Sequence, residues 1–244
     1  MRTIRIHVDL PLAAGIETVL PAQAGEHVAR VLRLAAGDPL TLFNGDGSDY
    51  TATITSVGKR EVLVRVQDQQ VVDRESPLRL TLAQGVARGE KMDLIVQKAT
   101  ELGVARIVPL LTERAEVKLD AARAEKRLAH WRAVAASACE QCGRARLPEI
   151  LPAQTLPVWL ASLDGDAAMR LALLPEAAVS VRELRAADAG ALLVVGPEGG
   201  LGERDVALLG ESGFTGLRLG PRILRTETAG LAAVAALQVL HGDF

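Results

Sequence analysis

Over the first 70 residues, hydrophobic and polar positions alternate in short runs, which is the pattern of half-buried β-strands. The runs predict four strands, and the stretch Asn44-Gly45-Asp46-Gly47 between the second and the third is a strong hairpin signal. The predicted strands are 4–8, 39–43, 50–57 and 61–66. The stretch 26–34 instead has apolar residues at helical spacing. The N-terminal part is therefore predicted to be a small β-barrel-like module.

Beyond residue 70 the pattern changes to alternating strands and helices. The polar stretch 68–77, which ends in proline, is the best candidate for a linker. Short and largely apolar strands follow it, as is typical of a parallel sheet covered on both faces. They are predicted at 78–83, 106–111, 170–174, 191–195 and 215–219, with helices at 89–102, 121–142, 203–212 and 229–240. We therefore predict two domains, a β-rich one over 1–72 and an α/β domain over 73–244.

The composition narrows the possible functions. With 49% hydrophobic and 24% charged residues the chain is globular, and with 2% aromatic residues it does not suit a base-stacking platform for single strands. A net charge of −2 excludes a globally basic nucleic-acid binder. The segment 88–146 nevertheless has twelve basic and eight acidic residues, so it could follow a phosphate backbone.

The two cysteines predict neither a disulfide framework nor a metal site. Two cysteines in a chain of this length indicate a reducing compartment. The apolar run 229–237 is also far shorter than the roughly 20 residues of a membrane span. We therefore expect a cytoplasmic protein. Cys139 and Cys142 fall late in a predicted helix, where the dipole disfavours a thiolate. The four histidines lack zinc-ligand spacing. The pair is therefore predicted to be two small half-buried side chains.

A glycine-rich loop, Gly196-Pro197-Glu198-Gly199-Gly200-Leu201-Gly202, follows a predicted strand and opens a helix. Open α/β sheets bind ligands at such places, and the glycines permit close approach to main-chain N–H groups. Glu198 would repel a phosphate, and no G-x-G-x-x-G is present. The loop thus favours a cationic or zwitterionic ligand. The alternative is a helix-entry loop whose glycines serve geometry alone.

A second strand also ends in Gly-Pro before a helix, for which Thr226 is the predicted N-cap and Glu227 lies in the first turn. Arg222 and Arg225 precede that helix, where its positive end already favours an anion. The alternative for both arginines is surface salt-bridging. The helix 229–240 is apolar on nearly all sides, which predicts burial in the core or against a partner subunit.

The two loops, GPEGGLGERD and LGPRILRTETAGLAAVAALQ, closely resemble the C-terminal motifs of the RsmE family, 16S ribosomal RNA uridine-N3 methyltransferases of the SPOUT superfamily. The segments 73–80, 88–104, 109–119 and 138–150 match family segments in the same order, so the resemblance spans essentially the whole chain. It implies a PUA-like β-barrel that helps to engage RNA, followed by a SPOUT-type α/β domain with a deep trefoil knot. Periodicity alone would never suggest a knot.

The resemblance also implies S-adenosylmethionine as cofactor and a homodimer in which two subunits complete each site. Helix 229–240 would supply the dimer packing, and adenine would lie against Leu219, Gly220 and Leu224. Carried over residue by residue, the cofactor-binding positions are Leu174, Pro175, Gly196, Pro197, Glu198, Gly199, Gly200, Leu219, Gly220, Ile223 and Leu224. Transfer from a sulfonium cation removes positive charge, so the reaction needs no metal.

The reactants suggest which side chains the chemistry needs. N3 of uridine carries a weakly acidic proton between two carbonyl groups, so methylation requires its loss and stabilisation of negative charge on O2 and O4. Arg225 is the first candidate for that stabilisation, through charge-assisted hydrogen bonds. Glu198 is the candidate for positioning or for accepting the proton, and Glu227 is the competing base.

Substrate positioning is expected from the N-terminal barrel and the basic middle segment, with 16S rRNA in the 30S subunit as substrate. The candidate RNA-binding residues are Arg88, Lys91, Lys98, Gln141, Arg144 and Arg222, and for each the alternative is a solvated face. Two other functions stay open. One is a nucleotide-binding protein, against which Glu198 speaks, and the other is a non-enzymatic RNA-binding or assembly factor that retains the cofactor pocket.

Overall fold

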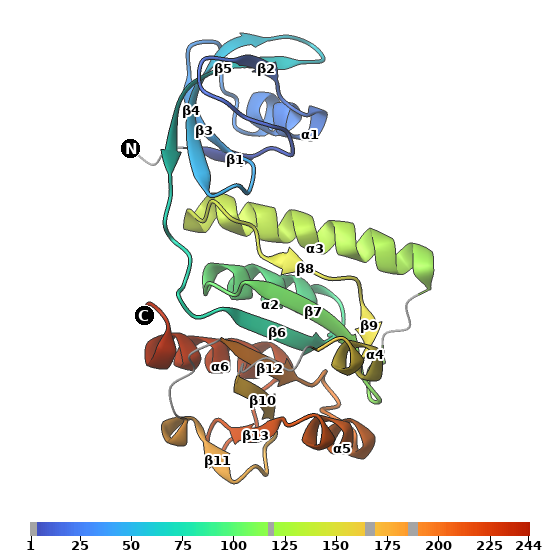
Figure 1. The fold of residues 1–244 in the computed structure, drawn as a ribbon. Coiled ribbons are helices and arrows are strands. Elements are labelled where there is room, and N and C mark those ends of the chain that lie inside the picture. Colours follow the sequence, from blue (N-terminus) through green and yellow to red (C-terminus); the bar gives the residue numbers. More distant parts are fainter. Residues whose placement is uncertain (1–3, 117–119, 164–168, 185–189) are drawn as a thin grey trace. The chain divides into compact units, whose positions relative to one another are not determined.

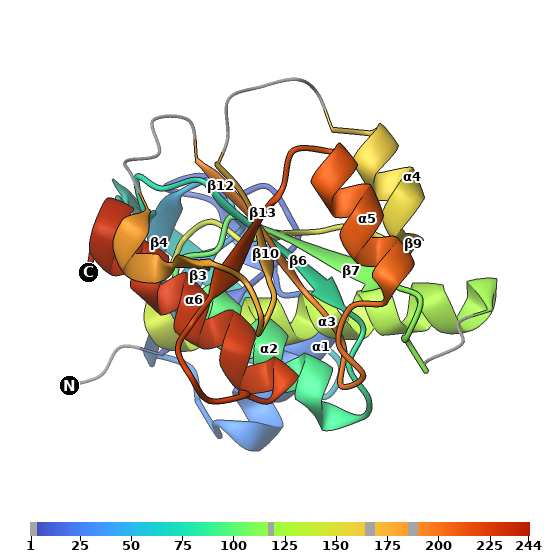
Figure 2. The same ribbon diagram turned by 90° about the horizontal axis from the view of Figure 1, so that it is seen from below.

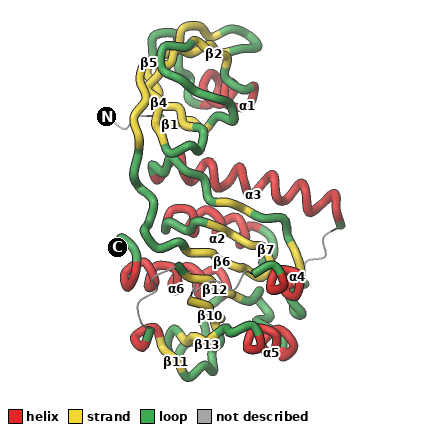
Figure 3. The backbone as a smooth tube through the Cα atoms, viewed as in Figure 1, coloured by secondary structure: helices red, strands yellow, loops and turns green. Residues whose placement is uncertain are grey.

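The computed structural model describes residues 4–116, 120–163, 169–184 and 190–244 (Figures 1 and 3). Residues 117–119, in the matched segment 109–119, lie outside the described residues. The chain forms two compact units, Met1–Glu75 with Ala136–Leu147, and Ser76–Ala135 with Pro148–Phe244. The predicted domains, 1–72 and 73–244, are continuous stretches. In the structure, the segment Ala136–Leu147 instead groups with the N-terminal unit.

The first unit is a five-stranded sheet in the order β1-β3-β4-β5-β2. The β1 and β3 strands pair in parallel and the others are antiparallel. Their bounds are β1 Arg5–His7, β2 Glu17–Val19, β3 Pro39–Phe43, β4 Ser48–Val57 and β5 Val62–Val71. The predicted strands are confirmed, although β5 runs on through the first residues of the predicted linker. Tyr50, Ala52 and Ile54 point from β4 into one core, as period-two alternation requires.

The helical spacing at 26–34 corresponds to two short elements rather than one helix. α1 spans Ala22–Glu26, and a π-helical turn follows at His27–Val31. Val28 is fully buried against the sheet.

The second unit is built on a parallel sheet in the order β11-β13-β10-β12-β6-β7-β8, and β9 also pairs with β7. The strands are β6 Leu80–Gly85, β7 Arg106–Leu111, β8 Glu149–Ile150, β9 Gln154–Thr155, β10 Met169–Leu173, β11 Val179–Ser180, β12 Ala191–Val195 and β13 Thr215–Arg218. All these pairings are parallel. In β12, Leu193 and Val194 are buried in different clusters, so both faces of this strand are covered.

Helices cover the two faces of this sheet. They are α2 Glu90–Glu101, the part of α3 Ala121–Cys142 up to Ala135, α4 Leu156–Ala161, α5 Glu203–Glu211 and α6 Thr226–His241, with a 3-10 turn at Val181–Glu183. Figure 2 shows α2 and α6 on one side and α4 and α5 on the other. Leu193 shares a cluster with Ile95 and Leu237, and Val194 shares one with Leu209. No helix in the described part of the chain is long and apolar enough to cross a membrane.

The strand order brings three loops together at the carboxyl ends of the strands. β10 lies between β13 and β12, and β12 in turn lies beside β6. Because the three strands run in parallel, the loops that follow β10, β12 and β13 meet at the same end. Strand pairing does not define how the chain threads, so the trefoil knot stays a prediction.

Helix α6 buries only one side within the chain. Gly230, Ala233 and Leu237 are buried, whereas Val239 is 64% exposed and Leu240 is also exposed. The expectation of burial nearly all round is therefore not met by this chain alone. An apolar stripe on α6 is left open to solvent.

Candidate active site

A pocket of about 580 Å³ lies in the second unit, where the loops after β10, β12 and β13 meet. All eleven predicted cofactor-binding residues line it, and so do the three catalytic candidates Glu198, Arg225 and Glu227. Of the predicted RNA-binding residues, Lys91 and Arg222 also line it. The structure therefore brings these side chains together, and their roles stay predictions.

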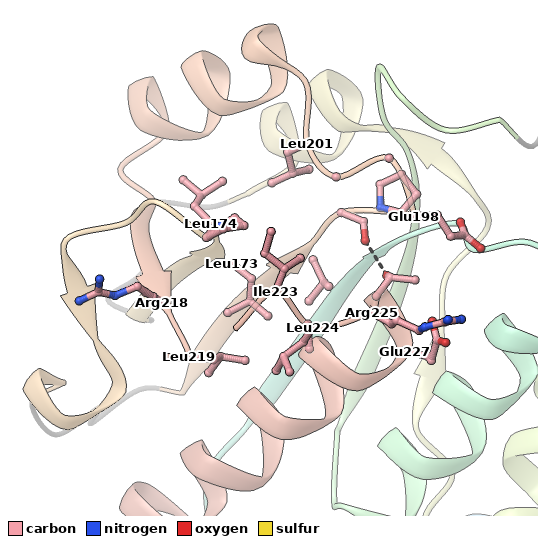
Figure 4. Close-up of a pocket in the computed structure, with 18 of the residues that line it drawn as sticks. Leu173, Leu174, Glu198, Leu201, Arg218, Leu219, Ile223, Leu224, Arg225 and Glu227 are labelled. Atoms are coloured by element: carbon pink, nitrogen blue, oxygen red, sulfur yellow. Dashed lines mark hydrogen bonds between the residues drawn. The ribbon is translucent and has the colours of Figure 1, made fainter. Parts of the chain in front are cut away.

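The pocket has an apolar side and a charged side (Figure 4). Five leucines and one isoleucine gather on the apolar side; they are Leu173, Leu174, Leu201, Leu219, Leu224 and Ile223. Ile223 is 85% exposed at the rim. Glu198, Arg225 and Glu227 lie together on the other side, and Arg218 points away from all of them. Such a division suits a ligand with an apolar and a charged part.

The glycine loop folds tightly on itself. A Cβ on Gly196 would lie 2.7 Å from the carbonyl carbon of Gly200, and Gly200 has φ +72°, which side chains rarely adopt. The amide of Gly200 donates to the carbonyl of Pro197 at 2.9 Å. These glycines are needed for the path of the loop itself, whatever binds beside it.

Thr226 ties this loop to helix α6. Its hydroxyl donates to the carbonyl of Gly196 at 2.6 Å (Figure 4) and accepts from Nε2 of Gln84 at 2.9 Å. The predicted N-cap is wrong, because Arg225 has the extended N-cap conformation and Thr226 is the first helical residue. The hydroxyl is used to join two loops instead of capping the helix.

Glu198 is held as a carboxylate. Its Oε1 accepts from Nζ of Lys91 and from the backbone amide of Arg88, both at 3.1 Å. Burial raises the pKa of Glu198, but hydrogen bonds from its own backbone, Arg88 and Lys91, with the Lys91 charge, outweigh burial and hold the pKa below its ordinary value. A carboxylate so stabilised is a weak proton acceptor.

The side chains of Glu227, Arg222 and Arg225 form fewer polar contacts with the described residues than Glu198 does. Oε2 of Glu227 is buried without a hydrogen-bond partner among the described residues, and it lies 3.9 Å from Nζ of Lys91. Arg222 and Arg225 are exposed and form no ion pair with any residue that the structure describes. The salt-bridging alternative for the arginines is therefore wrong within the described part of the chain.

The other predicted RNA-binding residues lie outside the pocket. Arg88 pairs with Glu116, and Lys98 with Glu101 at 2.8 Å, both in the second unit. Gln141 is exposed in the first unit.

Arg144 requires a correction. It is only 4% exposed, and its Nη2 bonds Oε2 of Glu75 at 2.5 Å while Nε bonds Oε1 at 3.2 Å. A guanidinium that is 4% exposed and bonded by both oxygens of one carboxylate presents little surface to a phosphate. Its basic character in the sequence gave no sign of the partner.

Sequence reasoning missed several lining residues, among them Arg114, Arg218 and Thr226, and also Gln84 beneath them. Arg114 donates to the carbonyl of Gly199 at 3.2 Å. It follows the carboxyl end of β7, which is a signal that could have placed it at this edge of the sheet.

Cys139 does not lie in an environment that would make its thiol reactive. Cys139 is buried, and a hydrogen bond with Cys142, together with burial, raises the pKa of its thiol. The described residues contain no group of three or more His, Cys, Asp or Glu side chains that could hold a metal ion.

Comparison with known proteins matches both parts of the chain. Residues 74–238 match the RNA methyltransferase domain family, and residues 20–67 match the RNA methyltransferase PUA domain family. Ribosomal RNA small subunit methyltransferase E of Buchnera aphidicola subsp. Schizaphis graminum is 32% identical over 99% of this chain and 98% of its own length. The Bacillus subtilis protein of the same name is 33% identical over 89% of each chain.

Solved structures agree over the whole length. A Legionella pneumophila protein in complex with the bound cofactor SAM is 40% identical, with a TM-score of 0.96 and complete coverage of both chains. A ribosomal RNA small subunit methyltransferase E from Neisseria gonorrhoeae bound to S-adenosyl methionine is 37% identical, with a TM-score of 0.92 and the same coverage. The chain, with its PUA-like first unit and the pocket of its parallel sheet, therefore belongs to the ribosomal RNA small subunit methyltransferase E family of RNA methyltransferases.

Proposed function

We propose that the protein transfers the methyl group of S-adenosylmethionine to N3 of a uridine in 16S rRNA, as a homodimer acting on the 30S subunit in the cytoplasm. The observation that carries the proposal is the pocket itself. It combines an apolar side with a charged side, on which Arg225 has no ion-pair partner and Oε2 of Glu227 no hydrogen-bond partner among the described residues.

The lining residues fit the cofactor. The volume lies within the roughly 300–1,000 Å³ range of small-molecule sites. When bound, S-adenosylmethionine supplies an activated methyl group on a sulfonium. Leu219, Gly220 and Leu224 offer apolar surface and backbone groups to an adenine, and Glu198 gives a negative environment to the cationic part. This agrees with the preference of the glycine loop for a cationic or zwitterionic ligand.

Arg225 is assigned to the developing negative charge of the uracil ring. Loss of the N3 proton places that charge on O2 and O4, and a guanidinium can donate charge-assisted hydrogen bonds to one of these oxygens while N3 stays open to the methyl group. Because Arg225 has no ion-pair partner among the described residues, its charge is not already used within the fold. Donors that are oriented before the reaction stabilise a transition state strongly.

Glu227 is assigned as the proton acceptor and Glu198 as a positioning group. The lowered pKa of Glu198 and its bond to Lys91 make its carboxylate a poor base. Oε2 of Glu227 has no hydrogen-bond partner among the described residues, although it is buried and lies 3.9 Å from Nζ of Lys91. We assign it to accept the proton through a water or after a small shift of its side chain when the uridine binds.

The open stripe on α6 supports the homodimer. Ala232, Val239 and Leu240 are exposed on the side of the helix that does not face the sheet. Apolar helix surface of this kind is typical of interfaces between identical subunits. α6 also begins at Thr226, in the pocket wall, so a partner packed on this stripe would lie close to the site.

The experiment that tests the proposal is a methyl-transfer assay with methyl-labelled S-adenosylmethionine. The substrate is 30S subunits from cells that lack this activity, and the products are nucleosides resolved by mass. Label in N3-methyluridine is the expected result, with naked 16S rRNA a poorer substrate than the subunit. Label in another nucleoside would overturn the assigned target. No label, with S-adenosylhomocysteine still bound in calorimetry, would favour a non-enzymatic RNA-binding factor.

A further inference from the structure

Gln84 is fully buried at the end of β6, and it is not among the side chains that line the pocket. Its Nε2 donates to the carbonyl of Gly85 and to the hydroxyl of Thr226, both at 2.9 Å, and lies 3.4 Å from the carbonyl oxygen of Gly196. Thr226 in turn donates its one hydroxyl proton to Gly196 at 2.6 Å. We call the Gln84 amide, the Thr226 hydroxyl and the Gly196 carbonyl the Gln84 clamp.

The clamp joins three segments that are far apart in the sequence. Gln84 is the second-last residue of β6, Gly196 begins the glycine loop, and Thr226 begins α6. Two of the three partners, Thr226 and Gly196, lie next to a site residue or close to one in the sequence. Arg225 precedes Thr226, and Glu198 lies two residues after Gly196. The clamp therefore fixes the two loops against each other at the points from which their functional side chains project.

Hydrogen bonds in such a place are stiff and directional. The cluster is buried, so its electrostatic attraction is stronger than in water, and an unmade bond there would leave a buried polar group unsatisfied. The amide oxygen of Gln84 has no partner among the described residues, which leaves the donors of Nε2 to orient the amide.

We propose that Thr226 and Gln84 are positioning residues. They hold Arg225 at a fixed position relative to the glycine loop and so couple cofactor binding to the orientation of the guanidinium. The inference rests on the proposed function and deepens it, because neither residue needs to touch the reacting atoms. It predicts that loss of the clamp displaces Arg225 and loosens the loop together.

Thr226→Val tests the clamp, because it removes the hydroxyl and keeps the shape. We expect the turnover number to fall about tenfold or more, since small displacements of a catalytic group have large effects. The dissociation constant of S-adenosylhomocysteine, measured by calorimetry, should rise about three- to tenfold. Thr226→Ser keeps the hydroxyl and should stay within about threefold of wild type in both measurements. Gln84→Met should resemble Thr226→Val.

The matched control is Thr100→Val. Thr100 is also buried, but its hydroxyl donates to the carbonyl of Val96 within α2 and it does not line the pocket. This change should lower the melting temperature without lowering turnover. It separates general destabilisation from loss of position.

A double variant gives the sharpest result. If Thr226 acts through Arg225, Thr226→Val should lower turnover no further once Arg225→Ala is present. Additive losses in the double variant would overturn the positioning role of the Gln84 clamp. Wild-type turnover and affinity in Thr226→Val would overturn it as well. A wild-type protein that bound S-adenosylhomocysteine but transferred no methyl group would overturn the proposed function instead, and the affinity comparison would still decide on the clamp.

Discussion

Arg144 in the first unit and Arg225 in the pocket resemble each other in the sequence, since each lies in a basic, family-like segment next to a helix. The fold treats them in opposite ways. Arg144 is 4% exposed and engaged by both oxygens of Glu75, whereas Arg225 is exposed and has no ion-pair partner among the described residues. A charge whose partner is built into the fold contributes to stability. A charge left without one, at the wall of a pocket, is available to a ligand.

The same contrast separates the two carboxylates of the pocket. Glu198 is hydrogen-bonded by Lys91 and by a backbone amide, whereas Oε2 of Glu227 has no hydrogen bond among the described residues and lies 3.9 Å from Nζ of Lys91. Groups held by hydrogen bonds within the fold should therefore affect stability more than turnover, and groups without such bonds should do the reverse. The following changes test that division, from the largest expected effect to the smallest.

Arg225→Ala should lower methyl transfer about 10³-fold, or about 4 kcal/mol in activation free energy, because it removes the donors to the uracil oxygens. The affinity for S-adenosylhomocysteine and the melting temperature should change little. Turnover on 30S subunits, calorimetry and thermal unfolding measure the three quantities. Arg225→Lys is the matched variant, and it should recover only part of the loss, since an ammonium lacks the planar fork. Turnover close to wild type in Arg225→Ala would end the assignment.

Arg144→Met should instead lower the free energy of unfolding by about 3 kcal/mol, since it leaves the Glu75 carboxylate partly buried without its partner. Urea denaturation measures it. The control is Arg106→Met, which breaks an exposed pair with Glu149 and should cost less than about 1 kcal/mol. Unchanged stability in Arg144→Met together with weakened RNA binding would reverse the comparison and restore the RNA-binding role.

Glu227→Gln should lower turnover about 100-fold near neutral pH, because general base catalysis contributes roughly 10²–10⁴-fold. Glu198→Gln should lower it by no more than about tenfold, mainly through weaker cofactor binding. A pH–rate profile separates the two. The remaining activity of Glu227→Gln should rise with pH, since hydroxide can replace the missing base. A larger loss in Glu198→Gln than in Glu227→Gln would exchange their roles.

Local features of this chain could be predicted well. The elements β3, β7, α3 and β12 begin and end at their predicted residues, because periodicity and strand or helix ends are properties of neighbouring positions. Much of the pocket lining could be predicted because it lies in the two contiguous motifs that carry the family resemblance, whereas Arg114 and Leu173 lie outside both motifs and were missed. The Gln84 clamp could not, since Gln84 and Thr226 are 142 residues apart and neither carries a local signal. The burial of Arg144 could not be predicted either, because a sequence does not show which carboxylate will meet a guanidinium.

The smallest effect concerns the pH dependence of stability at Glu198. Because the pKa of Glu198 is lower in the folded state, its carboxylate stabilises the fold above the unfolded pKa of about 4.3, and this contribution is lost as the pH falls through the folded-state value. The difference in free energy of unfolding between wild type and Glu198→Gln should be below about 1 kcal/mol, constant at neutral pH, and smaller in acid. Lys91→Met should reduce this pH dependence, since the Lys91 ammonium is one of the groups that lower the pKa. If the difference grew as the pH fell, the Glu198 carboxylate would not be stabilised by its hydrogen bonds and by Lys91. The contrast between Glu198 and Glu227 would then be wrong.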